Sequence, residues 1–174
     1  KGIQFLMKKN KIDVINGFGK IIDNKTIEVS NNSSKETINT DFIIISTGAS
    51  PNHFPGMEPD GKNIITYKDA LVIDEIPKHI AIIGAGAIGI EFAYFFNSFG
   101  SKVTIVEAQS HILPNEDIDV SKELERIFKS KKIDIKNGVK VNNILSKGKT
   151  ATVNLENSKI NCDKVLVAVG VKAN

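Results

Sequence analysis

Three glycines have the residue type and spacing to hold a dinucleotide. Gly84, Gly86 and Gly89 form a Gly-x-Gly-x-x-Gly turn directly after one apolar run and at the start of another. Such a turn presents backbone N–H groups and the positive end of a helix dipole to a pyrophosphate. Gly84 permits the tight turn, Gly86 lets the backbone approach the phosphates, and Gly89 lets helix and strand pack closely. The motif therefore predicts a dinucleotide site.

An acidic residue extends this motif. Residues 102–107 have a strand pattern that ends in Glu107, about 20 residues beyond the glycine turn. A carboxylate there accepts hydrogen bonds from the 2′-hydroxyl of an adenosine ribose and repels a 2′-phosphate, which favours NAD(H) over NADP(H). A lone glycine motif is a weak signal, but the flanking strand, helix and acid strengthen it. A glycine turn without a ligand is the alternative.

Composition excludes several other classes of function. The 174 residues are 41% hydrophobic and 25% charged, with a net charge of +3. Because the lysines are scattered, nothing indicates nucleic-acid binding, and no apolar run reaches membrane-spanning length. Cys162 is the only cysteine, which excludes an internal disulfide, fits a reducing compartment and is expected to be structural. No metal site is expected, and the three histidines are interpreted as surface or turn residues.

The elements that position these residues divide the chain into three parts. In residues 1–50 we expect the end of a helix, a short strand at 12–15, and β segments at 26–30 and 37–46. The last of these contains a buried-strand pattern, Phe42 to Ile45. Residues 51–78 hold four of the five prolines and are interpreted as a connector. Residues 1–50 are too short for a domain of their own and are expected to be the end of a longer one.

Residues 79–174 alternate between strand and helix patterns. We expect strands at 79–83 and 102–107, helices at 88–99 and 118–131, and later strands near 133–136, 140–145, 150–155 and 164–169. This alternation predicts a parallel sheet with right-handed crossovers, and the late short strands predict an antiparallel meander across it. The expected fold class is α/β, a Rossmann-like NAD-binding domain preceded by a partial β segment.

Several short motifs, in this order, carry a family resemblance. They are Val14–Lys20, Ile45–Pro51, the glycine turn, Ile112-Leu113-Pro114 and Val167–Gly170. Together they resemble the pyridine nucleotide–disulfide oxidoreductases, and within them the dihydrolipoyl dehydrogenases, over essentially all of the chain. In that family an inserted NAD domain interrupts an FAD domain, and a dimerisation domain follows. By resemblance, residues 1–50 are the C-terminal part of the first FAD segment, and residues 79–174 are the NAD domain.

The resemblance also implies site residues for both cofactors, FAD and NAD. For FAD, Phe18 and Gly19 would contact the adenine side, and Thr47, Gly48 and Ala49 would line the flavin. For NAD, Glu107 would bind the adenosine ribose, Glu91 would face the nicotinamide ribose, Val141 would flank the adenine and Gly170 the nicotinamide end. The pyrophosphate would lie on Gly84, Ala85, Gly86, Ala87, Ile88 and Gly89.

Some of these residues have structural interpretations as well. Thr47-Gly48 could be only a turn, Glu91 could only complement the helix dipole, and Val141 could be core packing. Ile112-Leu113-Pro114 is interpreted as a structural loop. The chain also departs from the family: it lacks a first FAD glycine motif, the redox-active disulfide and the C-terminal His and Glu, and it has Val171 where the family often has Arg.

The resemblance implies a parent enzyme that oxidises dihydrolipoamide through a disulfide and FAD and reduces NAD⁺. Such a parent is expected to be a homodimer that serves lipoyl-bearing 2-oxo acid dehydrogenase complexes, in a bacterial-type cytoplasm or an organelle matrix. This chain alone is expected to be catalytically inactive and to bind NAD at most. The alternatives are a part of an NADH oxidase or soluble transhydrogenase, a standalone nucleotide-binding module, or a scaffold fragment without nucleotide affinity.

Overall fold

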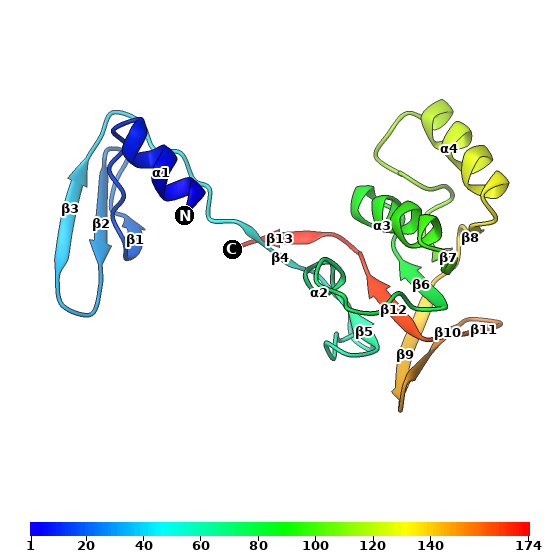
Figure 1. Cartoon of the computed structure of the whole chain (residues 1–174). Coiled ribbons are helices and arrows are strands. Elements are labelled where there is room, and N and C mark those ends of the chain that lie inside the picture. Colours follow the sequence, from blue (N-terminus) through cyan, green and yellow to red (C-terminus); the bar gives the residue numbers. More distant parts are fainter. The chain divides into compact units, whose positions relative to one another are not determined.

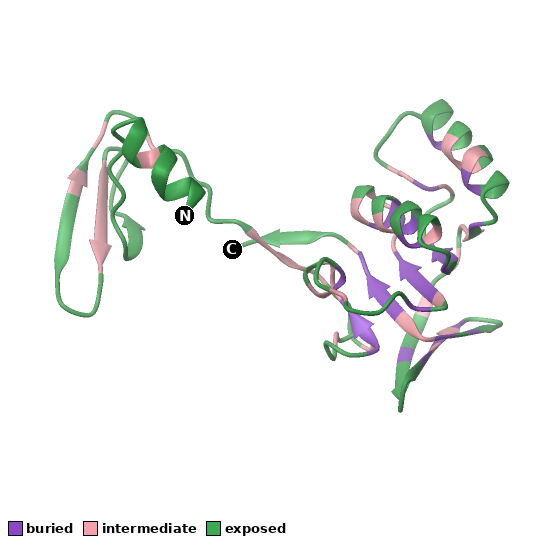
Figure 2. Cartoon of the chain, in the orientation of Figure 1, coloured by how far each residue is buried: buried purple, intermediate pink, exposed green.

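The computed structural model describes all 174 residues, which form two compact units (Figure 1). The first unit is Lys1–Thr47 and the second is Gly48–Asn174. Figure 2 shows that the buried residues belong to the second unit, and no residue of the first unit is buried. The predicted α/β class is confirmed, with a parallel five-stranded sheet and additional antiparallel strands.

The first unit combines one helix with a small antiparallel sheet. Helix α1 (Gly2–Lys9) precedes strands β1 (Phe18–Ile21), β2 (Thr26–Ser30) and β3 (Lys35–Asn39), in the order β1-β2-β3. The Asn31 side chain accepts hydrogen bonds from the Ser33 and Ser34 N–H groups, which forms the turn between β2 and β3. This turn holds the hairpin in register.

Two strands expected in the first unit are not formed. The pattern Phe42 to Ile45 predicted a buried strand, but Phe42 is 88% exposed and Ile44 is 89% exposed. Residues 12–15 also form no strand, and Ile12 and Val14 are exposed. A strand needs a neighbour for its backbone N–H and C=O groups, and neither segment has one among the 174 residues. The predictions of a strand at 12–15 and of a buried strand at Phe42 to Ile45 are therefore wrong.

A parallel sheet forms the centre of the second unit. Its strands are β5 (Ile64–Ile65), β12 (Lys164–Val167), β6 (His79–Ile83), β7 (Lys102–Val106) and β8 (Asp134–Lys136), in this spatial order. All four pairings are parallel. The segment 51–78, which was expected to be a connector, supplies the edge strand β5. Both sheet faces are covered, which explains why β5, β6 and β12 are almost continuously apolar.

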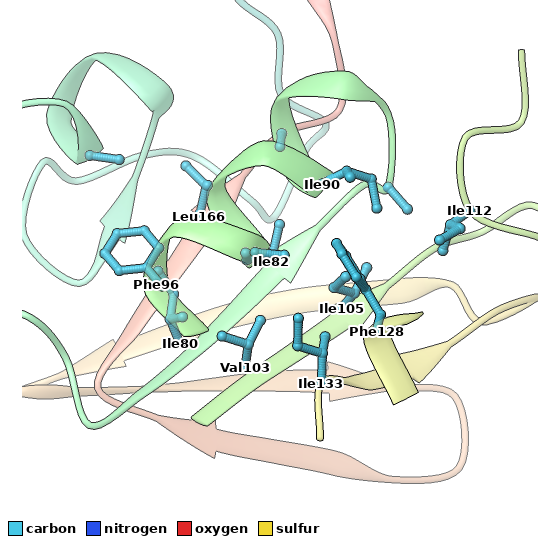
Figure 3. Close-up of a cluster of buried hydrophobic side chains, with 14 of the residues drawn as sticks. Ile80, Ile82, Ile90, Phe96, Val103, Ile105, Ile112, Phe128, Ile133 and Leu166 are labelled. Carbon is cyan, nitrogen blue, oxygen red and sulfur yellow. The ribbon is translucent and has the colours of Figure 1, made fainter. Parts of the chain in front are cut away.

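Helices cover one face of this sheet. Helix α3 (Ala87–Ser98) follows β6, helix α4 (Ile118–Ser130) follows β7, and the short α2 (Tyr67–Ala70) follows β5. Figure 3 shows Phe96 of α3 and Phe128 of α4 packed over Ile82 and Ile105 of the strands. The Asp117 side chain accepts the Asp119 N–H and caps α4. None of the helices is long and apolar enough to cross a membrane.

An antiparallel meander covers the opposite face, as predicted. It contains β9 (Val141–Lys147), β10 (Thr150–Leu155) and β11 (Lys159–Cys162), in the order β11-β10-β9. Successive side chains of β6 point to opposite faces of the sheet and so belong to different core clusters. Ile80 and Ile82 belong to the helix-side core, whereas Ala81 and Ile83 pack with the meander. A two-stranded antiparallel pair, β4 (Ala49–Pro51) with β13 (Val171–Ala173), completes the second unit.

Candidate functional site

A cavity of about 660 Å³ lies where the parallel strands end at their carboxyl termini. Residues that directly follow β6, β7 and β12 line it, together with Val139–Val141 at the start of β9. The carboxyl edge of a parallel sheet is where such folds bind ligands. Its volume is in the range that holds a small molecule or cofactor. Five of the residues singled out from the sequence line this cavity: Gly84, Gly86, Glu107, Val141 and Gly170.

The glycine turn has close contacts at its ends and open space at its centre. Gly84 has a φ of +98°, and a Cβ there would lie 2.5 Å from the Ala168 carbonyl oxygen. A Cβ on Gly89 would collide with the Gly84 carbonyl oxygen, which explains how α3 packs so closely on the turn. A Cβ on Gly86 would meet nothing within 4 Å. The space beside Gly86 therefore belongs to the cavity.

The start of α3 adjoins this open space through Gly86, whereas Ala87, Ile88 and Gly89 do not line the cavity. Gly86 is the N-cap residue, and no side chain caps the helix. The N–H groups of Ala87, Ile88 and Gly89 lie in the first turn, where a helix supplies no carbonyl partners. Helix α3 has 12 residues, and its dipole adds partial positive charge at this end. An anionic group in the cavity would satisfy these donors.

Glu107 has two roles in the geometry of this site. The residue is 92% buried, and Oε2 accepts the Ala85 N–H at 2.7 Å while Oε1 accepts the Gln109 N–H at 2.8 Å. Each carboxylate oxygen has a second lone pair, so it remains able to accept a hydroxyl donor from the cavity. The carboxylate therefore connects the end of β7 to the glycine turn as well as lining the cavity.

Ala85 is positioned differently from its neighbours in the turn. Its side chain is fully buried and does not line the cavity, and its N–H is engaged by Glu107. Its carbonyl oxygen accepts the Leu113 N–H at 2.8 Å. Leu113 has a φ of +48°, and it belongs to the loop whose next residues, Pro114 and Asn115, line the cavity. Ala85 thus positions the turn, and its N–H is not free for a phosphate.

Glu91 lies outside this cavity. It is exposed on α3 and lines a separate hollow of about 450 Å³ with Tyr67, Phe92 and Phe95. Glu91 lies more than one helical turn beyond Gly86, so its side chain projects from another part of the helix surface. The structure therefore does not bring Glu91 together with the residues that line the larger cavity.

The residues expected to contact FAD are distributed over both units. Phe18 and Gly19 lie on β1 and are exposed, and Thr47 is the last residue of the first unit. Gly48, with a φ of +80°, and Ala49 of β4 belong to the second unit. Their assignment to a flavin continues to depend on the family resemblance.

Three residues of the 51–78 segment line the cavity and were missed by the sequence analysis. They are Phe54, Pro55 and Met57. The prolines of this segment predicted a connector. However, it also contains an apolar Phe-Pro-Gly-Met run between polar residues, which indicates burial or contact. Only the fold brings this run beside residues that lie more than 80 positions later in the chain.

Two titratable groups with shifted pKa values lie away from the cavity. Burial, together with the nearby Lys102, lowers the pKa of His79, whose Nε2 lies 3.0 Å from Thr104 Oγ1 at the start of the sheet strands. Burial raises the pKa of the Cys162 thiol to about 11. A protonated, buried thiol is a poor nucleophile, which agrees with the structural role expected for Cys162.

Comparisons with known proteins agree with this architecture. The curated dihydrolipoyl dehydrogenase of Mycobacterium tuberculosis is 42% identical over 99% of this chain and 38% of its own length. That of Chlorobaculum parvum is 38% identical over 98% of this chain and 38% of its own length. The solved HOCl-induced flavoprotein disulfide reductase RclA of Escherichia coli superposes with a TM-score of 0.77 at 33% identity, over 99% of this chain and 41% of RclA.

The chain thus spans about two fifths of the length of these relatives. The family model described as pyridine nucleotide-disulphide oxidoreductase matches residues 1–174, the whole chain. The fold, the glycine turn with its acidic partner and these similarities agree. The chain belongs to the pyridine nucleotide-disulphide oxidoreductase family.

Proposed function

We propose that the second unit binds NAD(H) in the cavity at the carboxyl ends of its parallel strands. One observation carries this proposal: the open space at Gly86 adjoins both the uncapped start of α3 and the buried carboxylate of Glu107. A dinucleotide has a diphosphate for the helix end and a ribose diol for the carboxylate. Relatives named dihydrolipoyl dehydrogenase support this assignment, because these enzymes and their family use FAD and NAD(H).

The residues of this chain would bind and orient the dinucleotide. The N–H groups of Gly86, Ala87, Ile88 and Gly89 would donate to the diphosphate, and Glu107 would accept the adenosine ribose hydroxyls. Val141 would flank the adenine, and Gly170 would lie at the nicotinamide end. Lys140, the only basic side chain that lines the cavity, adds positive potential for the diphosphate. When bound, NAD⁺ supplies a hydride-accepting ring.

Selectivity for NAD(H) over NADP(H) follows from the charge on Glu107. A 2′-phosphate would replace the ribose hydroxyl that donates to this carboxylate, and two anionic groups would then share a largely buried site. The two hydrogen-bond donors to Glu107 are backbone N–H groups, and its carboxylate forms no ion pair with a basic side chain. The site is therefore expected to reject the phosphorylated cofactor.

The role of the whole parent protein is the second part of the proposal. We infer a parent that oxidises dihydrolipoamide and reduces NAD⁺, in which Phe18, Gly19, Thr47, Gly48 and Ala49 contact FAD. The inferred parent is a homodimer that acts with lipoyl-bearing 2-oxo acid dehydrogenase complexes, in a bacterial-type cytoplasm or an organelle matrix. The inference is supported by identities of 38–42% over nearly the whole chain. The 174 residues alone would bind NAD(H) without catalysing the reaction.

A second candidate is a different disulfide reductase of the same family. RclA of Escherichia coli, a flavoprotein disulfide reductase, is 33% identical to this chain with a TM-score of 0.77. The same NAD(H) site would serve such a parent, because the glycine turn and Glu107 do not depend on what is oxidised. The two candidates differ in the substrate of the parent and in the direction of electron transfer: one oxidises a dithiol and reduces NAD⁺, and the other reduces a disulfide.

Parallel calorimetric titrations with NADH and NADPH test the NAD(H) assignment. We expect the 174-residue chain to bind NADH and to bind NADPH at least about tenfold more weakly, which corresponds to about 1.4 kcal/mol. Binding of neither nucleotide by the folded chain would contradict the proposal. A preference for NADPH would contradict only the role of Glu107 in selectivity, and not the assignment of a dinucleotide site.

A further inference from the structure

Residues 52–57 form a strap across the cavity between β12 and β9. At one end the Asn52 N–H donates to the Gly170 carbonyl oxygen at 3.0 Å, just beyond β12. At the other end the Gly56 carbonyl oxygen accepts the Ile144 N–H of β9 at 2.8 Å. The Met57 side chain is 93% buried in the core between the central sheet and the meander. The strap is therefore held at both ends.

The end of the strap near β9 is closely packed. Gly56 has a φ of +83°, and a Cβ there would lie 3.2 Å from Asn143 Cβ and 3.3 Å from the Asn142 carbonyl oxygen. The Gly56 N–H also donates to Glu58 Oε1 at 3.1 Å, and the Met57 N–H donates to the Phe54 carbonyl oxygen at 3.0 Å. These contacts fix the backbone on both sides of Pro55 and so determine where Phe54 lies.

Phe54 lines the cavity, yet 52% of its surface is exposed. Asn52 and His53 do not line the cavity, whereas Phe54, Pro55 and Met57 do. The part of the strap that faces the cavity is therefore the part anchored to β9. When a ligand covers a half-exposed aromatic ring in a cavity wall with a flat apolar surface, the burial of the ring contributes favourably to the free energy of binding.

The adenine end of the proposed dinucleotide would lie beside this ring. The Val139 N–H donates to the backbone carbonyl oxygen of Glu107 at 3.0 Å, and both Glu107 and residues 139–141 line the cavity. Val141 begins β9, the strand to which the strap is anchored through Ile144. An adenine attached to a ribose at Glu107 would reach the region between Val141 and the strap.

We propose that Phe54 is a stacking contact for the adenine ring in this cavity. This inference rests on the proposed binding of NAD(H). Phe54 supplies an aromatic surface and Val141 supplies an aliphatic one to the adenine ring. Stacking of this kind tolerates different bases, so recognition here selects a flat aromatic ring and leaves selection of the ribose to Glu107.

The test compares three ligands with variants at Phe54. NADH and ADP-ribose contain the adenine, and nicotinamide mononucleotide does not. We expect Phe54→Ala to weaken both adenine-containing ligands by about tenfold, with Phe54→Tyr retaining the wild-type affinity and Phe54→Leu intermediate. Binding of nicotinamide mononucleotide is expected to be unchanged. Phe99→Ala is the matched control, because Phe99 is similarly exposed, at 62%, and lines no part of the cavity.

A fluorescence measurement gives an independent readout. The chain contains no tryptophan, so the Phe54→Trp variant has a single reporter at the proposed contact. We expect ADP-ribose to quench this fluorescence, and Phe99→Trp to show no response. Unchanged affinity of Phe54→Ala for NADH and ADP-ribose, or a loss confined to nicotinamide mononucleotide, would overturn the adenine contact. Failure of the wild-type chain to bind NADH would instead contradict the proposed function.

Discussion

At the scale of single residues, Glu107 is the best example of a side chain with two functions. The sequence predicted its contact with a ribose, but not its hydrogen bonds to the Ala85 and Gln109 N–H groups. Spacing along the chain identifies an acid at a strand end, whereas its backbone partners become visible only when the glycine turn is folded beside it. Substitution of Glu107 is thus expected to affect both stability and binding.

Glu107→Gln leaves one carbonyl oxygen for two backbone donors, because the amide nitrogen of Gln cannot accept a hydrogen bond. We expect the free energy of unfolding to fall by about 1–3 kcal/mol, as measured by urea denaturation. Affinity for NADH should fall with it, while discrimination against NADPH should weaken. Gln109→Ala is the matched control, since it retains the backbone N–H that Glu107 engages. Wild-type stability of Glu107→Gln would show that these hydrogen bonds are unimportant.

Substitutions of Gly86 and Gly89 are expected to have different effects, the first mainly on NADH binding and the second mainly on stability. Gly86 has a φ of −74° and open space beside it, so Gly86→Ala is expected to lower stability by about 1 kcal/mol or less, the cost of a poorer N-cap. Its methyl group would nevertheless obstruct the diphosphate, so NADH affinity should fall at least about tenfold.

Gly89→Ala provides the contrast, because its Cβ would collide with the Gly84 backbone. A loss of about 1–3 kcal/mol in stability is expected. Thermal unfolding and calorimetry of both variants check this pair of predictions. Equal effects of the two substitutions on stability would contradict the geometry of the turn.

Cys162 is expected to be chemically inert in the folded chain. Burial raises the pKa of its thiol to about 11, so almost none is thiolate at neutral pH. A thiol reagent should therefore modify Cys162 slowly at pH 7.5 and rapidly after denaturation in urea. The folded state favours the protonated thiol, so stability is lost as pH rises from about 9 toward 11. Rapid modification of the native chain would contradict burial of this thiol.

At the scale of elements, the regular strand and helix patterns were predicted well. The strand patterns at 79–83 and 102–107 and the helix pattern at 118–131 correspond closely to β6, β7 and α4. The apolar periodicity of each segment indicates that one face is buried. In this fold, elements that lie close by in the sequence cover that face. The expected strand within 37–46 failed beyond β3, since Phe42 and Ile44 have no partner strand and are exposed. Periodicity reveals a preference for burial, but not whether a neighbouring strand exists.

Strand pairing at the start of β6 is expected to depend on pH. Burial and the nearby Lys102 lower the pKa of His79, while Asp163 and Asp134 oppose this shift. The folded state therefore binds this proton less readily than the unfolded chain does, so stability is lost as pH falls below about 6.5. Urea denaturation at pH 7.5 and pH 5.5 should show a smaller difference for His79→Gln than for the wild-type chain. An equal difference would exclude His79 as the titrating group.

At the scale of the whole molecule, the two units differ in how completely they bury their apolar residues. Every residue of the candidate cavity lies between Phe54 and Gly170, within the second unit. We therefore expect a chain of residues 48–174 to fold alone and to bind NADH with the affinity of the full chain. Circular dichroism and calorimetry of the two chains check this. A folded 48–174 chain that does not bind NADH would show that the first unit contributes to the site.

The site could be predicted only in part because its residues come from distant segments. A local motif revealed the glycine turn, and its spacing to a strand end revealed Glu107. Phe54 and Pro55 reach the cavity only because β5 joins the sheet beside β12, and Leu113 acts through a backbone hydrogen bond to Ala85. The partners of neither contact could be identified from the sequence, since both contacts arise from packing across distant segments.

A crystal structure of this chain with bound NAD⁺ would show directly where the dinucleotide binds. We expect the diphosphate at the start of α3, with its oxygens about 2.7–3.2 Å from the backbone nitrogens of residues 86–89, and the adenosine ribose on Glu107. A dinucleotide bound anywhere else on the chain, with the space beside Gly86 left open, would contradict this expectation.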